Sequence, residues 1–405
     1  AWTAVEASRL DEKRARFLQD RFGPGSPEIS ALLDDNFRWR MQTMKTTHFG
    51  LATPCLHPDR VVTVREHADT IRMLSSQALA LAQTQAGPAL LGLAGAPPSL
   101  PFAGMSRPYY IYRPEGPGGP SLVRIPQAFS EGVAFSGGVR VYREGQEVPS
   151  CLLDVRLHTD GSVEEAAVVF LSDLGSGEEA VYWVSRSSDS GVVEPEYGFV
   201  ASGSGLLDNG LVRLAFDVDG WPISLQRDGL EFSAERLLSP GITHRGGHAG
   251  PAQLEPDGSS GSVRQRGFLA RHASSGQYQI ECDGQFLEGS VRYDFRMYAG
   301  LPFVEIQAED IYPALGETCV EDLTETYPLG ITPALSGYGL RVWKHKYFDY
   351  TGSYEVAEPT DSLNNHVTAS WMAVSDESMG LMVAYNSEQR AGLAFCPIKV
   401  RSDPS

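Results

Sequence analysis

Aromatic and basic residues gather in one short stretch of the chain. Trp343, Tyr347 and Tyr350 lie there beside Lys344 and Lys346. Aromatic rings present flat apolar faces, and those of tyrosine and tryptophan also carry a polar tip, which suits the C–H surfaces and hydroxyls of a sugar. The pattern therefore indicates a contact with a glycan. The same residue types also fill the edges of β-sandwiches with one end in water, and that interpretation stays open.

Adjacent carboxylates occur at three places, Glu164-Glu165, Glu178-Glu179 and Glu309-Asp310. A retaining glycosidase needs two carboxyl groups about 5 Å apart across the bond that it cleaves. Neighbouring residues on a strand point to opposite faces of the sheet and fail that geometry. We therefore interpret all three pairs as solvated charge. The sequence has no Gly-x-Ser-x-Gly motif, so it gives no support to serine-hydrolase chemistry.

The histidines give weaker signals. The stretch His158-Thr-Asp-Gly161 lies between two predicted strands, so we interpret it as a hairpin tip rather than as a pair of metal ligands. His57 and His67 flank the third predicted helix, and we assign them solvated surface roles. His244 and His248 share a glycine-rich loop, but no third ligand accompanies them.

Composition restricts the partners. The 405 residues carry a formal net charge of -18, which repels the phosphates of nucleic acids and anionic lipids. No apolar run approaches the roughly 18 residues that cross a bilayer. We predict a soluble protein without a nucleic-acid or membrane partner. The sequence leaves open whether the protein forms an oligomer. Five widely spaced cysteines indicate neither a disulfide framework nor a CxxC site.

The start of the chain carries no recognisable signal peptide, which favours the cytoplasm. The first residue is Ala1 rather than methionine. We therefore expect the chain to be processed or to be a piece of a longer polypeptide.

The hydrophobic pattern changes period near residue 87. Before this point, apolar residues recur at helical spacing and predict helices over 3–22, from residue 27, and over 61–81. The second helix has an apolar stripe at i, i+4 steps, formed by Ile29, Leu33, Phe37, Met41 and Met44. After this point, short β-branched and aromatic runs separated by turn signals predict antiparallel sandwiches. The run 291–297 alternates apolar and polar residues, which predicts a strand with one buried face.

These patterns predict an α+β, mostly β fold. We expect a three-helix bundle over 1–86, a linker over 87–104, a small antiparallel β-sandwich over 105–200 and a large one over 201–405.

Four groups of stretches carry a family resemblance through their common order along the chain. They are 108–114 with 122–126, 139–149 with 166–184, 206–217 with 219–225, and 298–306 with 371–385. In this order they resemble the C-terminal half of glycoside hydrolase family 38, the α-mannosidases. That family follows a catalytic α/β domain with a three-helix bundle and β-sandwich domains. The resemblance therefore implies the same arrangement here, with a galactose-mutarotase-like larger sandwich.

The resemblance also implies a zinc-dependent retaining α-mannosidase-like activity on a glycan or glycoside. In the family, zinc and a nucleophilic aspartate lie in the N-terminal α/β domain, and a histidine from the loop after a helix of the bundle reaches the zinc. His48 lies at the corresponding place, which implies that it is a zinc ligand. Neutral imidazole suits that role. A histidine that packs in the loop is the alternative. We expect the nucleophile and the other ligands on an N-terminal catalytic α/β segment outside these residues, and no hydrolysis by this chain alone.

Two other functions stay open. The stretch 155–163 also resembles a strand and turn of exo-acting rhamnogalacturonan lyases, which would make the chain a polysaccharide lyase-like protein. The net charge argues mildly against the anionic substrate of such an enzyme. The third possibility is a non-catalytic sugar-binding or scaffold protein.

Overall fold

The structure is a computed structural model of the chain. It describes residues 2–23, 25–43, 58–116, 119–198, 201–203, 205–232, 241–244, 252–253, 255–256, 261–282, 285–311, 323–326, 341–345, 354–357, 371–375 and 380–384.

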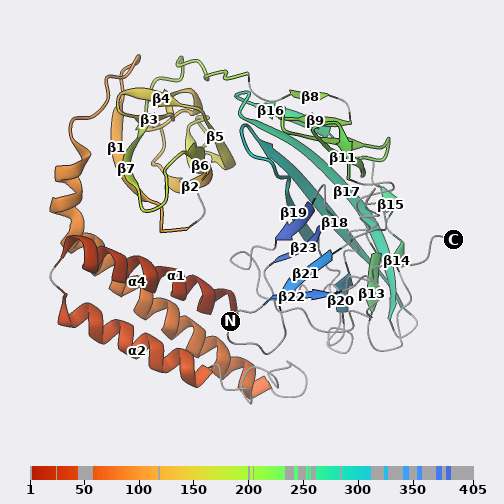
Figure 1. The fold of residues 1–405 in the computed structure, drawn as a ribbon, viewed down its shortest axis with the longest axis horizontal. Helices are drawn as coiled ribbons and strands as arrows, with labels where there is room; N and C mark the ends of the chain where they lie inside the picture. Colours follow the sequence, from red (N-terminus) through yellow and green to blue (C-terminus); the bar gives the residue numbers. More distant parts are fainter. Residues whose placement is uncertain are drawn as a thin grey trace.

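Three α-helices occupy the first part of the described chain: α1 (Trp2–Phe22), α2 (Pro27–Thr43) and α4 (Pro58–Ala94). Both α1 and α2 pack on α4, as Figure 1 shows. Their shared centre consists of fully buried aliphatic side chains, among them Ala15, Ile29, Leu33 and Ala78. Among the described helices, none is both long and apolar enough to span a bilayer.

Helix α2 buries the first part of the predicted stripe, including Ile29, but not the part that follows, and Met44 lies outside the described residues. Leu33 is buried as expected, but Phe37 and Met41 are 52% and 55% exposed. Residues advance by about 100° around a helix, so each i, i+4 step overshoots a full turn by about 40°. A stripe built from such steps alone therefore rotates out of the interface. Asn36 and Arg40 occupy the buried positions instead.

The buried polar residues of α2 are all paired. The Asn36 amide donates to the Ser8 hydroxyl (2.9 Å) and to the backbone carbonyl of Ile71 (2.6 Å), so it joins all three helices. Arg40 forms an ion pair with Glu12 of α1. Since buried polar groups are tolerated when they are hydrogen-bonded, these contacts fix how the helices align.

Helix α4 continues beyond the predicted start of the linker at residue 87 and ends at Ala94. It passes through Pro88, whose ring removes one backbone donor from the helix. In this last part Leu91 and Leu93 are exposed. Figure 1 shows this end of α4 leaving the other helices and rising toward the strands that follow. The connector between helix and first strand is therefore shorter than predicted.

The small sandwich consists of two antiparallel sheets with the orders β1-β7-β3-β4 and β2-β6-β5. A short 3-10 helix, η1 (Ser136–Gly138), precedes β3. The strands are β1 (Met105–Tyr112), β2 (Ser121–Ala128), β3 (Val141–Arg143), β4 (Gln146–Val148), β5 (Ser150–Leu157), β6 (Val163–Ser172) and β7 (Glu179–Arg186). Alternate residues of each sheet meet in one core, where Val141, Val168, Phe170 and Tyr182 are buried.

The later strands form four further antiparallel sheets. Their orders are β12-β11-β10-β9-β8, β15-β17-β18-β19 with β16 on β17, β14-β13-β20, and β22-β21-β23-β24. The first of these strands are β8 (Ala201–Gly203), β9 (Leu206–Asp208), β10 (Val212–Phe216), β11 (Pro222–Arg227), β12 (Leu230–Glu231), β13 (Gly241–His244), β14 (Ala252–Gln253), β15 (Glu255–Pro256) and β16 (Gly261–Gln265). The remainder are β17 (Leu269–Cys282), β18 (Gln285–Tyr298), β19 (Glu305–Ile311), β20 (Leu323–Thr326), β21 (Arg341–His345), β22 (Tyr354–Ala357), β23 (Trp371–Ser375) and β24 (Gly380–Ala384). The predicted mostly β fold class, with helices followed by antiparallel sandwiches, is confirmed.

Strand β18 is buried on both faces from Tyr293 to Tyr298, so the prediction of one buried face is wrong for this part of 291–297, whereas Arg292 is exposed. Phe295 and Met297 lie in the apolar core, and Asp294 and Arg296 between and beside them are also buried, at 5% and 4% exposure. The polar face is covered because the small sandwich packs there. Charged side chains can occupy such a face only when they are paired.

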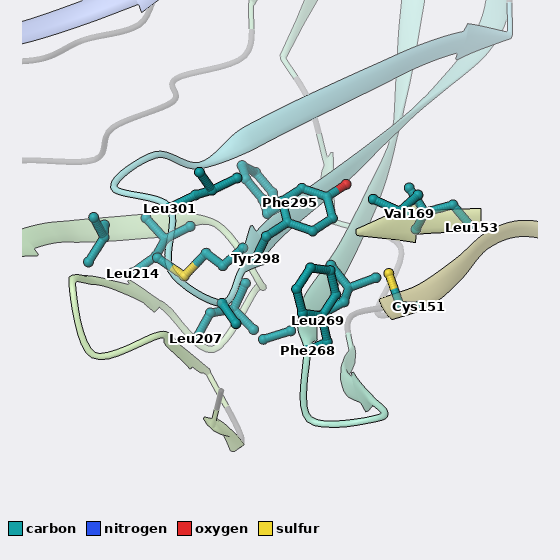
Figure 2. Close-up of a cluster of buried hydrophobic side chains, with 14 of the residues drawn as sticks. Cys151, Leu153, Val169, Leu207, Leu214, Phe268, Leu269, Phe295, Tyr298 and Leu301 are labelled. Atoms are coloured by element: carbon teal, nitrogen blue, oxygen red, sulfur yellow. The ribbon is translucent and has the colours of Figure 1, made fainter. Parts of the chain in front are cut away.

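One apolar core continues from the small sandwich into the large one. Figure 2 shows Cys151, Leu153 and Val169 of strands β5 and β6 beside Phe268 and Tyr298 of the large sandwich. The cysteine is fully buried, and burial raises the pKa of its thiol to about 12. The two sandwiches therefore share apolar packing instead of meeting only through a linker.

Candidate functional site

The residues predicted to bind metal or sugar fall mostly outside the described part of the chain. His48, Tyr347 and Tyr350 all lie there. Trp343 belongs to β21, where its backbone pairs with Val356 of β22 and Ala373 of β23. The assignments of His48 to zinc and of the three aromatic residues to a glycan therefore stay predictions.

Among the described residues, no group of three His, Cys, Asp or Glu side chains could hold a metal ion. The interpretation of 158–161 as a hairpin tip is confirmed. The N–H of His158 donates to the carbonyl of Ser162 (2.8 Å), and its Nε2 lies 2.9 Å from the carbonyl oxygen of Phe129. Asp160 accepts hydrogen bonds from the hydroxyl and the N–H of Ser162, which lower the pKa of its carboxyl. These polar atoms shape a turn.

Two other described histidines have packing roles. His67 is half-buried and meets Trp39 edge to face, with 4.9 Å between ring centroids, so its predicted solvated role is wrong. His272 is buried in the large sandwich, stacks on Phe216 at 3.7 Å, and has Nδ1 2.7 Å from the Ser262 hydroxyl. Burial lowers the pKa of His272, which favours the neutral ring.

The predicted solvated carboxylates divide into two groups. Glu164 and Glu165 both pair with Arg156 at the surface, at 3.1 and 3.0 Å, in agreement with solvated charge. Exposed pairs of this kind contribute little to stability, typically about 0–1 kcal/mol. Glu309 and Asp310 lie on β19, and their side chains are outside the described part.

For Glu179 the solvated interpretation is wrong. Its carboxylate accepts hydrogen bonds from the Arg21 guanidinium (2.9 Å) and from the Tyr110 hydroxyl, and these bonds lower its pKa. Beside them, Phe17 of α1 stacks on Tyr112 of β1 with 4.4 Å between centroids. Glu179 thus helps to attach α1 to the outer face of the small sandwich.

Within the described part, a connected group of charged side chains lies between the two sandwiches. Arg124 of β2 donates to the Tyr298 hydroxyl (3.2 Å) and pairs with Glu305 of β19, and the Tyr298 hydroxyl donates to the same carboxylate (2.6 Å). Burial opposes ionisation of Glu305, but the hydrogen bonds from Arg124 and Tyr298 outweigh it, so the net pKa is lowered. Burial and the charge of Glu305 raise the pKa of Tyr298, which keeps the phenol protonated.

A second chain of ion pairs continues from this point along β18. Arg296 donates to Asp294 through Nε (2.8 Å) and lies 3.5 Å from Asp154 of β5. Asp294 also binds Arg271 of β17. We call the residues of both chains the inter-sandwich network; its members are Arg124, Asp154, Arg271, Asp294, Arg296, Tyr298 and Glu305.

The network is suited to holding the sandwiches together and unsuited to catalysis. Each of its carboxylates is engaged by at least one guanidinium, whereas a catalytic acid must be protonated and a nucleophile must face its substrate. Removing one partner of a buried pair leaves an uncompensated charge. This cost favours a fixed geometry between β2, β5 and β18.

Asn209 makes a third connection within the large sandwich. Its amide donates to the carbonyls of Tyr298 and Leu301, both at 2.8 Å, and its Oδ1 accepts from the N–H groups of Leu211 (3.0 Å) and Val212 (2.8 Å). The side chain is buried. It therefore ties the turn between β9 and β10 to the turn that follows β18.

Sequence reasoning had selected the stretches that contain these residues but not the residues themselves. Arg124 lies in 122–126, Asn209 in 206–217, and Tyr298 and Glu305 in 298–306. These residues join three of the four groups of stretches that carried the family resemblance, and the remaining group, 139–149 with 166–184, pairs with the first through β6 and β7. An arginine inside a strand that otherwise alternates into a core is the local signal that could have identified Arg124.

Of two cavities in the described part, the larger has a volume of about 470 Å³ and lies between the connector after α4 and strands β3 and β7. The smaller, of about 260 Å³, is lined by Ala273, Ser274, Ser275 and Arg292. The carboxylates at the larger cavity are Glu144, paired with Arg143 at 3.5 Å, and Glu179. Neither cavity presents two carboxylates free of partners, so each is suited to binding rather than to cleaving a glycoside.

The fold and the inter-sandwich contacts define a helical and double-sandwich architecture. By sequence, the chain matches no protein-family model and no curated protein. By structure, it is similar to an alpha-mannosidase from Enterococcus faecalis V583, with a TM-score of 0.62 and 11% identity over 94% of this chain and 48% of that chain. It is also similar to a protein in the Glycosyl Hydrolase Family 38 from Enterococcus faecalis, with a TM-score of 0.60 and 12% identity over 94% of this chain and 49% of that one.

The chain thus has the fold of about half of each of these two proteins. The fold that the resemblance implied is confirmed. Fold likeness at this level of identity speaks to architecture, because one fold hosts many functions.

Proposed function

We propose that this chain is the C-terminal part of a zinc-dependent retaining α-mannosidase-like glycoside hydrolase. Its nucleophile and most of its zinc ligands would belong to an N-terminal catalytic α/β segment. The observation that carries the proposal is the structural likeness, which extends over 94% of this chain but only 48% of the alpha-mannosidase. The described residues support the division of labour, because their carboxylates at the cavities and in the inter-sandwich network are already paired.

His48 is the residue of this chain that we propose as a zinc ligand. It follows the end of α2 at Thr43. Near that end of α2, Phe37 and Met41 expose apolar side chains, which suit contact with a further protein segment. One histidine cannot hold a catalytic zinc, which takes about three protein ligands. The catalytic segment would supply the others, and the metal when bound would provide Lewis-acid chemistry and a binding position for sugar hydroxyls.

Trp343, Tyr347 and Tyr350 are the residues that we propose as contacts of the glycan. The backbone of Trp343 lies within the sheet β22-β21-β23-β24, so this part of the stretch has a rigid support. Sites built on strands hold side chains more precisely than sites on loops. A stacked ring also orients a sugar without needing a charge.

The proposal is tested by reconstitution. The 405-residue chain alone should hydrolyse nitrophenyl α-mannoside at the background rate, and expression together with the N-terminal α/β segment should produce hydrolysis that chelator removes. Activity of the isolated chain that disappears when one of its own acids is replaced would contradict the proposal. Failure of every catalytic segment to confer activity, combined with sugar binding by the chain, would favour a non-catalytic sugar-binding protein.

One experiment distinguishes a zinc-ligand role of His48 from a packing role. In the assembled enzyme, His48→Ala should lower zinc occupancy and activity with little change in melting temperature, whereas loss of a buried packing histidine typically costs about 1–3 kcal/mol with or without metal. His158→Ala is the matched control, because His158 belongs to a hairpin turn. It should leave zinc content unchanged. Zinc content and melting temperature with and without chelator give the answer, and unchanged zinc with a lowered melting temperature in His48→Ala rules out the ligand role.

A further inference from the structure

The larger cavity lies on the outer face of the small sandwich. Its wall is the connector after α4, including Ala96 and Pro97, and its floor is β7 with the turn between β3 and β4. Its volume of about 470 Å³ falls within the range of roughly 300–1,000 Å³ that is typical of small-molecule sites. It is separated in sequence from every residue that we propose for zinc or glycan binding.

Strand alternation determines the side chains on the floor. Glu179, Val181 and Trp183 point to the same face of β7, because successive residues of a strand alternate. Trp183 is only 9% exposed and lines the cavity together with Pro97. Arg143 completes the floor from the end of β3. The lining therefore combines apolar rings with one guanidinium, Arg143, and two carboxylates, Glu144 and Glu179.

The polar groups of the floor are held by other side chains. Glu179 is fixed by Arg21 and Tyr110, and Arg143 pairs with Asp173 and lies 3.4 Å from the Tyr182 hydroxyl. Groups held in this way lose little entropy when a ligand arrives. Each carboxylate of the lining has a guanidinium partner, Arg21 for Glu179 and Arg143 for Glu144, so the floor presents no uncompensated carboxylate to attract a cation or to repel a neutral ligand.

We propose that this cavity is an accessory binding site for one or two neutral hexopyranoside rings, separate from the place of cleavage. Apolar ring faces complement the C–H surface of the sugar, the guanidinium donates to hydroxyl oxygens, and the carboxylate accepts from hydroxyls. The choice of an α-mannoside as ligand rests on the proposed function. Because Arg143, Glu144 and Glu179 are all already engaged in ion pairs, the site holds sugar without cleaving it.

The test measures binding by the 405-residue chain itself, so it does not depend on catalysis. Ligand-observed NMR and calorimetry with methyl α-mannoside and an α-linked mannobiose should detect binding, and glucuronate should bind more weakly. Ala96→Trp places a large ring in the cavity from the exposed connector, and it should weaken binding by roughly tenfold or more, about 1.4 kcal/mol. Leu91→Trp is the matched control, because Leu91 is 68% exposed on α4 and does not line the cavity.

The outcomes are distinct. Binding that is lost in Ala96→Trp and kept in Leu91→Trp supports the site, and equal binding by both variants overturns it. Absence of binding by the unmodified chain, or binding of glucuronate alone, also overturns it. In the assembled enzyme, Ala96→Trp should hydrolyse nitrophenyl α-mannoside at the normal rate. An assembled enzyme with no activity but an intact sugar site would count against the proposed function and leave the accessory site standing.

Discussion

A single substitution at Asn209 tests the contact between two turns of the large sandwich. Asn209→Asp keeps the Oδ1 acceptor for Leu211 and Val212 and replaces the amide donor with oxygen. The carbonyls of Tyr298 and Leu301, now bonded at 2.8 Å, would then face an acceptor. The substitution changes almost no volume, so packing is preserved, and at neutral pH it exchanges the amide donor for an ionisable carboxyl that can only accept.

The expected cost follows from these two carbonyls. A buried polar group left without a partner costs about 1–3 kcal/mol, so the variant should lose roughly 2–6 kcal/mol. For a domain of about 150–250 residues, each kcal/mol lowers the melting temperature by about 2–4 °C. A loss of about 3 kcal/mol therefore predicts a decrease of roughly 6–12 °C. At low pH the new carboxyl is protonated and donates one bond, so the difference from wild type should narrow.

The assay is thermal and urea unfolding followed by tryptophan fluorescence, across a pH series. Asp208→Asn is the matched control, because Asp208 belongs to the same turn and its Oδ1 accepts from the exposed N–H of Gly210, a bond that asparagine retains. That control should change stability by about 0.5 kcal/mol or less. Wild-type stability of Asn209→Asp, or a deficit independent of pH, would refute the hydrogen-bond argument.

Three further predictions concern the contact between the sandwiches. Arg124→Met and Glu305→Gln should each destabilise the protein by about 1–3 kcal/mol, because each single change leaves the other residue without its charge partner. The double variant should therefore be destabilised by less than the sum of the two. A double-mutant cycle in urea measures this difference, and additive effects would count against coupling. The folded pKa of Glu305 is lowered, so its stabilisation is complete above its unfolded pKa of about 4.5 and is lost as pH falls through the folded value. Melting temperature should consequently fall more steeply below about pH 4.5 in wild type than in Glu305→Gln, and parallel curves would contradict this. The Cys151 thiol, with its pKa raised to about 12 by burial, should resist iodoacetamide at neutral pH until urea unfolds the protein, as peptide mapping can show.

Periodicity predicted the helices better than it predicted their buried faces. It located three helices in the first part of the chain, and the observed α1, α2 and α4 cover those ranges. It assigned Phe37 and Met41 to the interior because they are apolar, whereas the 3.6-residue turn brings Asn36 and Arg40 there. A buried amide or guanidinium becomes acceptable only through a partner on another helix. Such partners are a property of the tertiary structure and leave no mark in a hydrophobic pattern.

The strands show the same limit for a different reason. The alternation in 291–297 indicates a strand with one wet face, and this would hold for a sandwich standing alone. Here the small sandwich covers the second face, and Arg296 and Asp294 are satisfied by each other and by Asp154 from more than a hundred residues earlier. Whether a polar face meets water or another domain cannot be read from one strand.

The family resemblance predicted the fold through stretches whose residues contact one another in the structure. The stretches around Arg124, Asn209 and Tyr298 meet between and within the sandwiches, so their residues constrain one another through hydrogen bonds and ion pairs. Two chains can share a fold at an identity as low as the 11–12% found here. The charged residues of these stretches do not indicate a catalytic role, because they pair with one another and hold the sandwiches together. The reconstitution and His48 experiments therefore look for sugar chemistry outside these paired groups.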